Sequence, residues 1–450
     1  MTGLAISAHP LLTGTPALIP AHGVGSRKDL PLPFTYLLVG AAVVLVLSFI
    51  ALVVFWREPR VRDHHGVLLP RFVAAFLNSR VVRAGAAAVS LLLFAVTVAA
   101  LAFGADDATN PAPYLVFVWL WVGVLAMSLV FGPVWVVLNP IRWIHLGVCR
   151  LARVDPDTAI LRYRLGYWPA ALGLFAFTWL ELVAPDRTSQ AVLGSAVALF
   201  IVMDLLGAFL FGRTWFQWAD PFEVLSRLYG ALSLLGHRPD RRWVLRSPLA
   251  GLEQIPVRPG LLGAVAVMLG STAYDGFSAN PAWFGFSQAS PVPVLTQTAG
   301  LVAMIAFVIA TVSLAGWAGA VLSGTDARGM AAVFAPSLVP IAAGYAVAHY
   351  WSLGVYAGQY TLTLLTDPLG TGGDYLGTRH LTPGSALIAP TLVATLQAAA
   401  IVLGHVVGIV HAHERAVSRF DRRGALLGQL PMLALMVLYT CGGLLLLFSS

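Results

Sequence analysis

Long apolar blocks recur along this 450-residue chain from Phe34 to its C-terminus. Each block is roughly 17 to 25 residues long, which at about 1.5 Å per residue crosses about 30 Å of hydrocarbon. A segment inside lipid must satisfy its backbone hydrogen bonds internally, so each block predicts a spanning helix. We therefore expect an all-α, polytopic transmembrane helix bundle of about ten spans, at residues 34–56, 84–103, 114–138, 167–182, 191–211, 259–274, 294–322, 335–365, 386–410 and 430–448.

The composition supports a membrane protein. Apolar residues make up 58% of the chain and charged residues 10%, whereas soluble domains are about half apolar and a quarter charged. The net charge of +7 comes from short arginine-rich runs between apolar blocks. Such runs are topology signals and do not resemble a nucleic-acid-binding surface. We expect the partners to be the lipid bilayer and a small-molecule or ion substrate, and no nucleic acid.

The basic residues predict the orientation. With ten spans, 23 of the 27 Lys and Arg residues fall in alternate connections on one side and four on the other. Because cytoplasmic connections carry the excess, both termini should lie outside a multi-pass cell-membrane protein. Residues 1–33 then form an extracytoplasmic N-terminal segment and 34–450 a transmembrane helical domain. Cys149 and Cys441 fall on opposite faces, so no disulfide is expected.

Two exits toward the basic side resemble each other. The third span is followed by Gly132, Trp135 and Asn139-Pro140, and the fifth span by Gly212, Trp215 and Asp220-Pro221. An Asn or Asp before Pro suits the N-cap and first turn of a helix. We expect a repeat of spans 2–3 and 4–5, each with an amphipathic interfacial helix, at 141–151 and 222–235. Two matched turns can also arise by chance in a chain this apolar.

The eighth span carries a polar stripe at spacings of three or four residues, which places its members on one helical face. A stripe of this length cannot face lipid without leaving donors and acceptors unpaired. We expect it to line an outward-opening cavity, although packing against another polar helix is the alternative. Its members are His349, Ser352, Tyr356, Gln359, Thr363 and Asp367.

Further polar residues fall within spans, among them Glu181 near the outer end of the fourth span. Asp204 lies mid-way along the fifth span, and a carboxyl at that depth needs a partner or a water-filled cavity. It is either part of an ion or proton relay or a protonated acid bonded to a neighbouring helix. His405 in the ninth span joins the predicted cavity-lining set. Its depth differs too much from that of His349 for the two to hold a haem between them.

Several motifs resemble those of a known family, and they cover nearly the whole chain. They are Ala21-His22-Gly23, Asp29-Leu30-Pro31, Ala219-Asp220-Pro221-Phe222-Glu223-Val224, Ser271-Thr272-Ala273-Tyr274-Asp275, Ala348-His349-Tyr350 with Gly358-Gln359, Asp367-Pro368-Leu369-Gly370, Gly404-His405-Val406 and Ala412-His413-Glu414-Arg415-Ala416. Together they resemble a family of multi-pass actinobacterial membrane proteins commonly named fenitrothion hydrolase. Tyr274 and Glu414 stand where Phe and Asp are more usual in it.

That family name implies hydrolysis of an organophosphate ester, but the resemblance carries over no catalytic residue. Hydrolases of this kind generally use clustered His and Asp residues that hold metal ions and activate water. On the predicted outer face, His9 and Asp367 belong to the wider set of such residues. The metal-ligand candidates we select from it are His22, Asp275, Asp374 and His380.

The residues leave three functions open, and they do not decide whether the chain is an enzyme. The polar stripe and Asp204 favour a permease or a small-solute or ion-binding protein. The family resemblance favours a membrane-embedded hydrolase. The third function is copper handling at the outer face, because a chain beginning at His22 would present an amino group and an imidazole to Cu²⁺.

Overall fold

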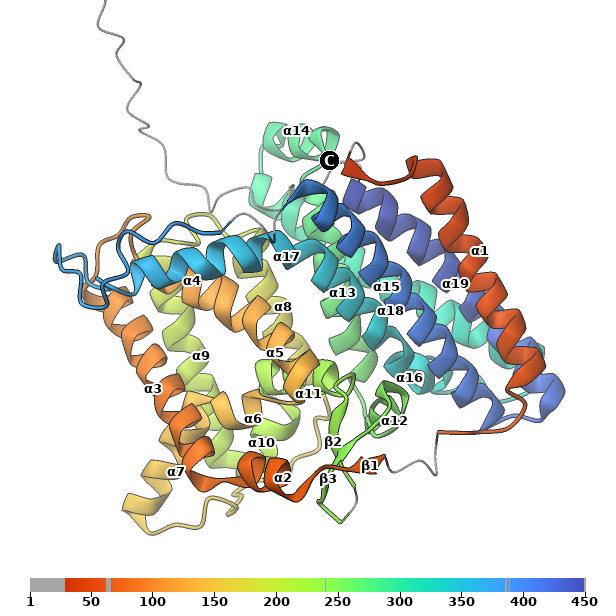
Figure 1. Cartoon of the computed structure of the whole chain (residues 1–450), viewed down its shortest axis with the longest axis horizontal. Coiled ribbons are helices and arrows are strands. Elements are labelled where there is room, and N and C mark those ends of the chain that lie inside the picture. The colour runs from red at the N-terminus through yellow and green to blue at the C-terminus, as the bar shows by residue number, and fades with distance from the viewer. Residues whose placement is uncertain (1–28, 62–65, 239, 385–386, 388, 449–450) are drawn as a thin grey trace, which may run out of the picture.

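The structure is a computed structural model that describes residues 29–448, with gaps at 62–65, 239, 385–386 and 388 (Figure 1). The expected segment 1–33 and His22 therefore fall largely or wholly outside the described residues. The α-helices are α1 (Phe34–Phe55), α2 (Arg71–Asn78), α3 (Arg80–Phe103), α4 (Ala112–Tyr114), α5 (Val124–Phe131), α6 (Trp135–Leu138), α7 (Pro140–Ala152), α8 (Trp168–Leu182), α9 (Gln190–Phe211), α10 (Arg213–Trp218), α11 (Pro221–Gly230), α12 (Pro248–Glu253), α13 (Leu261–Ser278), α14 (Pro281–Ala289), α15 (Pro293–Ser323), α16 (Met330–Phe334), α17 (Val339–Leu364), α18 (Pro390–Val417) and α19 (Arg422–Phe448). A π-helix, η3 (Leu115–Gly123), joins α4 to α5, and a 3₁₀-helix, η4 (Ala335–Leu338), joins α16 to α17.

Within the described residues, nine helices are long and apolar enough to cross a membrane, and the shorter apolar α8 accompanies them. Their outward faces carry large apolar side chains that no neighbour covers, such as Leu47 on α1, Leu199 on α9 and Leu314 on α15. Exposed apolar surface on this scale suits lipid and not water. The chain is thus a mostly helical, multi-pass membrane protein.

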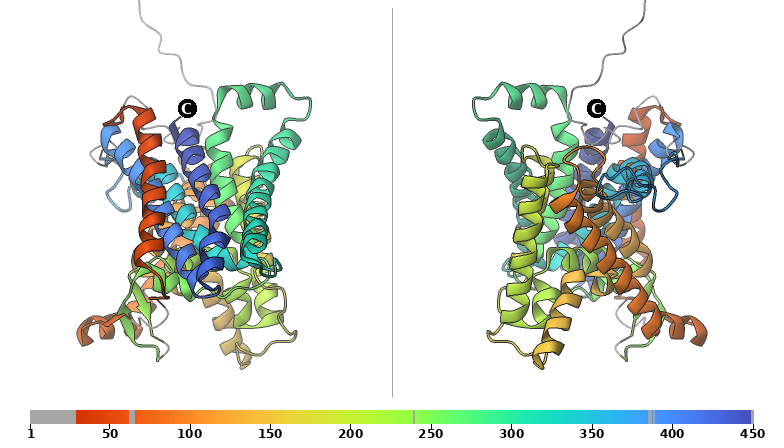
Figure 2. Two further views of the ribbon diagram at one scale, coloured as in Figure 1. Left: turned by 90° about the vertical axis from the view of Figure 1, so that its right-hand side faces the viewer. Right: turned by 90° about the vertical axis from the view of Figure 1, so that its left-hand side faces the viewer.

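The connections divide between the two ends of the bundle. In Figure 1, α2, α7 and the strands lie along the lower end, and the same end of the bundle is down in both views of Figure 2. This end holds most of the arginines, and we call it the arginine-rich end. The opposite, arginine-poor end holds α14 and the C-terminus of α19. Phe34 at the start of α1 packs there against Phe448, with ring centroids 5.9 Å apart.

A small sheet lies at the arginine-rich end, where no strand was expected. It consists of β1 (Val67–Leu68), β2 (Leu235–His237) and β3 (Trp243–Leu245), in the order β1-β3-β2. Both pairs are antiparallel, with Val67 opposite Leu245 and Gly236 opposite Val244. The sheet joins two connections that are far apart in the chain, and it leaves the helical class of the fold unchanged.

Helices α17 and α18 form a close contact at the centre of the bundle, where their backbones approach each other at glycines. A Cβ added at Gly344 would lie 2.3 Å from the carbonyl oxygen of Ala400, and one at Gly404 would lie 2.5 Å from that of Pro340. On α18, Ala400, Gly404 and Gly408 recur every four residues. Small residues at this spacing let membrane helices pack backbone to backbone, where dispersion forces are strongest.

Several helix ends differ from the expected ones because long-range contacts set them. The third span ends at Phe131 and not at 138, since Gly132 adopts a φ of 84° before Pro133. The ninth span continues to Val417 and not to 410, because His411, His413, Glu414 and Arg415 find buried partners there. The tenth begins at Arg422 and not at 430.

The two expected interfacial helices differ in the structure. Helix α7 buries Ile141, His145 and Cys149, four residues apart, and leaves its opposite face exposed. Helix α11 ends at Gly230 and not at 235, and every one of its residues except Arg227 is buried. It packs on α5 and α8, so it does not present the exposed polar face that a surface helix needs.

Substitution of Gly344 tests the contact between α17 and α18. We expect Gly344→Ala to lower the apparent melting temperature of the detergent-purified protein, through overpacking that costs about 1–3 kcal/mol. The matched control is Gly358→Ala on the same helix, where nothing lies within 4 Å of the added Cβ. Equal melting temperatures for the two variants would contradict this account of the packing.

Candidate functional site

A hydrogen-bonded group joins α13 to α17 near the arginine-poor end. His349 Nε2 lies 2.9 Å from Asp275 Oδ2, and the Tyr350 hydroxyl donates to the same oxygen over 3.1 Å. His349 and Tyr350 are buried, and the Asp275 side chain is 13% exposed. A buried carboxylate is stable only with such donors around it.

Two more elements reach this group. Glu181, one residue before the end of α8, lies close enough to Asp275 and Tyr350 to interact with them electrostatically. The Trp121 indole on η3 hydrogen bonds to the Tyr350 side chain. A π-helix is rare and is found frequently at functional sites. We refer to Glu181, Asp275, His349 and Tyr350 as the acidic centre.

Buried polar atoms around the acidic centre have no hydrogen-bond partner within the described residues. They are Glu181 Oε2, Ser271 Oγ, Tyr345 Oη and Ser352 Oγ. Ser271 precedes Asp275 by one helical turn, and Tyr345 precedes His349 by one turn. Native structures rarely leave such atoms unpaired, and water or a bound polar group usually satisfies them. Water or a bound polar group would find hydrogen-bond partners at these atoms.

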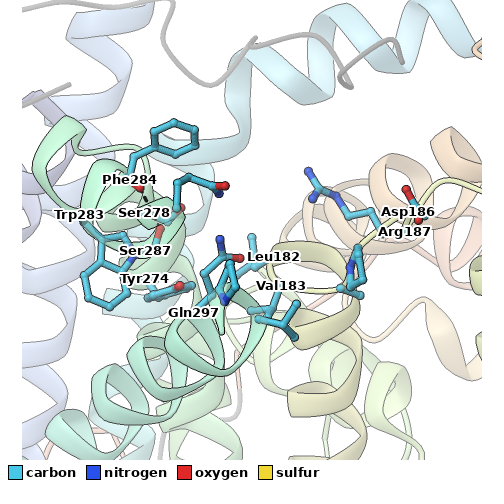
Figure 3. Close-up of a pocket in the computed structure, with 15 residues that line it drawn as sticks. Leu182, Val183, Asp186, Arg187, Tyr274, Ser278, Trp283, Phe284, Ser287 and Gln297 are labelled. Carbon is cyan, nitrogen blue, oxygen red and sulfur yellow. Dashed lines mark hydrogen bonds between the residues drawn. The ribbon is translucent and has the colours of Figure 1, made fainter. Parts of the chain in front are cut away.

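A pocket of about 400 Å³ lies next to the acidic centre. Its lining includes Leu182, which follows Glu181, and Tyr274, which precedes Asp275. Figure 3 shows the aromatic rings of Tyr274 and Trp283 on one side and Arg187 on the other. The pocket therefore offers both apolar and hydrogen-bonding contacts, as small-molecule sites commonly do.

The predicted cavity-lining stripe divides into two parts. His349 belongs to the acidic centre, and Ser352 is buried beside it. Beyond them, the later turns of α17 run across the bundle and are seen nearly end-on in the right-hand view of Figure 2. None of the eight residues predicted to line a cavity lies among the lining residues of the pocket.

Two of the remaining members of the stripe, Gln359 and Asp367, hold the loop that follows α17. The Gln359 side chain accepts a hydrogen bond from Gly384 N over 3.0 Å, and Thr363 Oγ1 donates to Tyr360 O over 2.7 Å. Asp367 accepts from Thr371 N and Gly372 N. These bonds outweigh the effect of desolvation and lower the pKa of Asp367. Tyr356 is half-buried on the same helix.

The metal-ligand candidates do not come together. Within the described residues, no three His, Cys, Asp or Glu side chains are close enough to hold a metal ion. Asp275 is tied to α17, whereas Asp374 bonds to Thr366 and to Arg379 N in the loop, contacts that lower its pKa. The described part of the chain therefore does not bring Asp275, Asp374 and His380 together as a ligand set. His22, the fourth candidate, lies outside the described residues.

Asp204 and His405 lie outside the acidic centre. His405 Nδ1 is 2.8 Å from Ile401 O on its own helix, next to the glycine contact with α17. Asp204 accepts from Trp215 Nε1 over 2.5 Å and belongs to a second polar group, at the arginine-rich end.

The end of α18 connects four other segments. His411 and Arg415 both contact Glu253 Oε1 at 3.1 Å, and Arg415 also donates to Val333 O. Glu414 accepts from Trp56 Nε1, Arg60 N and Val61 N, and His413 bonds to Gln429 and Trp56 O. This pairing accounts for the polar residues at this helix end, so we assign them a structural role.

The sequence contained signals for the acidic centre that its analysis missed. The apolar block ends at Tyr274, so Asp275 was expected in an outer connection. In the structure, α13 continues to Ser278, and Asp275 lies in this helix. Ser271 and Asp275 are four residues apart, as are Tyr345 and His349. Two such pairs on neighbouring spans indicate a polar interface between them.

Comparison with protein-family models, curated proteins and solved structures finds no match.

The ion group at Glu253 predicts a pH dependence of stability. Burial opposes ionisation of Glu253, but contacts with His411 and Arg415 outweigh it and lower its pKa below 4.5. Ionised Glu253 therefore stabilises the fold above its unfolded pKa, and this contribution disappears as the pH falls through the folded pKa.

We expect Glu253→Gln to lose about 1–3 kcal/mol of stability at neutral pH, because Arg415 loses its charged partner. The variant should also show a weaker fall in melting temperature on acidification. Glu58→Gln, at an exposed carboxylate near the same end, is the control. An unchanged pH profile in Glu253→Gln would refute the assignment.

Proposed function

We propose that this protein is a permease-like membrane protein. It binds a small solute in the pocket at the arginine-poor end and a proton or cation at the acidic centre. The observation that carries the proposal is the set of unpartnered buried oxygens around Asp275, His349 and Glu181, next to the pocket. Intramembrane ionisable groups with water access commonly mark ion or proton pathways.

The charges at the centre favour a positive ligand. Glu181 and Asp275 supply two carboxyl groups, and His349 supplies one imidazole. No Lys or Arg occurs in α13 or α17, and Arg187 of the pocket, which interacts electrostatically with Glu181, offsets one of the two carboxyl groups. An uncompensated carboxylate buried in a membrane protein costs free energy. Binding a proton or a monovalent cation neutralises its charge and removes this cost. Hydroxyls of Ser271, Tyr345 and Ser352 add oxygen ligands suited to such an ion.

We further propose ten crossings of the cell membrane, with both termini outside. The contact between Phe34 and Phe448 supports an even number of crossings, because both ends of the helical region then lie on one face. The nine long helices and α8 make this number. The arginine-rich end is cytoplasmic in this arrangement, and the pocket opens to the outside.

A membrane-embedded hydrolase is the second candidate, as the family resemblance implies. The 2.9 Å contact between Asp275 and His349 is the observation that favours it, since a carboxylate that orients an imidazole can serve a general base. This version needs no metal cluster. Copper handling at His22 rests on a segment outside the described residues and gains no support.

Flux measurements test the permease. Full-length protein in liposomes that contain a pH-sensitive dye or a sodium indicator should conduct one of these ions, alone or with an added solute. Asp275→Asn and His349→Ala should reduce the flux roughly tenfold, the effect of losing a contact worth about 1–3 kcal/mol. Asp107→Asn, at an exposed carboxylate of an outer connection, should leave it unchanged.

Ester hydrolysis by the same preparation decides between the two candidates. Organophosphate cleavage that disappears in His349→Ala, without any ion flux in the wild type, would replace the permease with the hydrolase. Flux that is indifferent to both Asp275→Asn and His349→Ala would exclude the acidic centre as the transport site.

A further inference from the structure

The two similar turns after the third and fifth spans meet each other at the arginine-rich end. Each begins at a glycine with positive φ, 84° at Gly132 and 62° at Gly212. A short helix follows in each, α6 or α10, and then an N-cap before Pro, Asn139 or Asp220. Both N-cap side chains accept from their own helices, α7 and α11.

Equivalent positions of the two turns pair with one another. Asn139 Nδ2 donates to Asp220 Oδ2 over 2.6 Å, and these residues are 81 apart in the chain. Arg142 forms an ion pair with Glu223, also 81 residues away. The two segments thus contact each other through equivalent positions. Binding sites commonly lie where such repeats meet.

Asp204 of α9 completes this junction. It accepts from Trp215 Nε1 with Oδ1, while its Oδ2 has no N–H or O–H partner within the described residues. Its carboxyl group instead lies within hydrogen-bonding reach of the Asp220 carboxyl. Asp204 is 2% exposed and Asp220 is fully buried. Two carboxylates can bond to each other only if one of them carries a proton.

The charges of the junction indicate how many protons it holds. Asp204, Asp220 and Glu223 are acidic, and Arg142 and Arg227 are basic, with Arg227 Nη2 2.7 Å from Glu223 Oε1. Fully ionised, this buried group has one excess negative charge. One proton makes it neutral, and a neutral buried group avoids the large cost of an uncompensated charge.

We propose that Asp204 and Asp220 share one proton and form a proton-binding site at the junction of the two similar segments. The site lies apart from the acidic centre, at the opposite end of the bundle, and it does not depend on the proposed function. Burial raises the pKa of Asp220 to about 7, with a further contribution from Glu223.

The surrounding elements contribute few other charges. Helix α7 presents Arg142 and His145, and burial together with Arg142 lowers the pKa of His145. Arg213 of α10 pairs with Asp157 at 2.9 Å. Helix α3 carries its charges, Arg80 and Arg83, in its first turn, and α11 supplies Glu223 and Arg227. No other carboxyl group among these is free to take the proton, because Glu223 bonds to both arginines.

Infrared spectroscopy of the full-length protein in lipid nanodiscs tests the site. A protonated carboxylic acid has a carbonyl stretch that carboxylates lack. Isotope labelling of the aspartates shifts their carbonyl band and so distinguishes it from the band of protonated glutamates. We expect this band in the wild type to disappear as the pH rises through about 7. Since the two acids are coupled, that value belongs to the pair.

Two variants assign the band. Asp204→Asn replaces the shared proton with an amide donor to Asp220, so the titrating band should be lost. Asp220→Asn should lose it as well, and Asp275→Asn should retain it. The matched control is Asp157→Asn, which changes an exposed carboxylate at the same end.

Stability gives an independent readout. Because the folded pKa of Asp220 is raised from 3.8 to about 7, the wild type loses stability as the pH rises between these values. At alkaline pH the group in Asp204→Asn is neutral in sum, so the melting temperature of this variant should exceed that of the wild type there.

The wild-type spectrum alone can overturn the proposal, even if the variants fail to fold. If the wild type shows no aspartic-acid band that titrates near neutrality, the proposal is wrong. The proposal is also wrong if the band persists in both Asp204→Asn and Asp220→Asn.

Discussion

The close approach of α17 to α18 determines where the polar chemistry of this protein can lie. Lipid tails are as apolar as leucine, so two membrane helices gain little from hydrophobic burial and depend on van der Waals contact and internal hydrogen bonds. Gly344 on α17 and Gly404 on α18 allow backbone contact. That contact holds the first half of α17 against the bundle, so that His349 and Tyr350 reach Asp275 on α13. The acidic centre thus depends on residues that have no polar side chain.

Hydrophobic block length predicted nearly all of the long helices, because crossing lipid imposes the same requirement on each. Block length gave the wrong helix end where a helix continues past its apolar residues. Asp275 was expected in an outer connection, but α13 continues to Ser278 and includes it, and His349 and Tyr350 supply its donors. Five of the six stripe residues lie on α17, whereas Asp367 follows the end of this helix at Leu364. Periodicity does not reveal which neighbour each turn meets. Gln359 and Asp367 therefore hold a loop, and neither lines the pocket near the acidic centre.

The polar groups are distributed in a way that suits a protein exposed to two different aqueous phases. The acidic centre lies near the ends of α8 and α13, whereas the Asp204 and Asp220 pair lies at the exit of α9. Each group combines a buried carboxyl with donors from a neighbouring helix, and each leaves a carboxyl oxygen without a donor within the described residues. Helix α13, which carries Asp275 of the acidic centre, is buried along most of its length.

The position of α1 has a consequence for biosynthesis. This helix packs mainly on α18 and α19, and Glu414 of α18 binds the backbone of Arg60 from 354 residues further along the chain. During translation, α1 leaves the ribosome long before either partner exists. It is therefore inserted into the bilayer before its packing partners, and its side chains suit a helix surrounded by lipid. It has no Asp, Glu, Lys or Arg, and its mean hydropathy of 3.1 is the highest of the nine long helices described. The segment that closes the bundle is thus the one best able to survive alone in lipid.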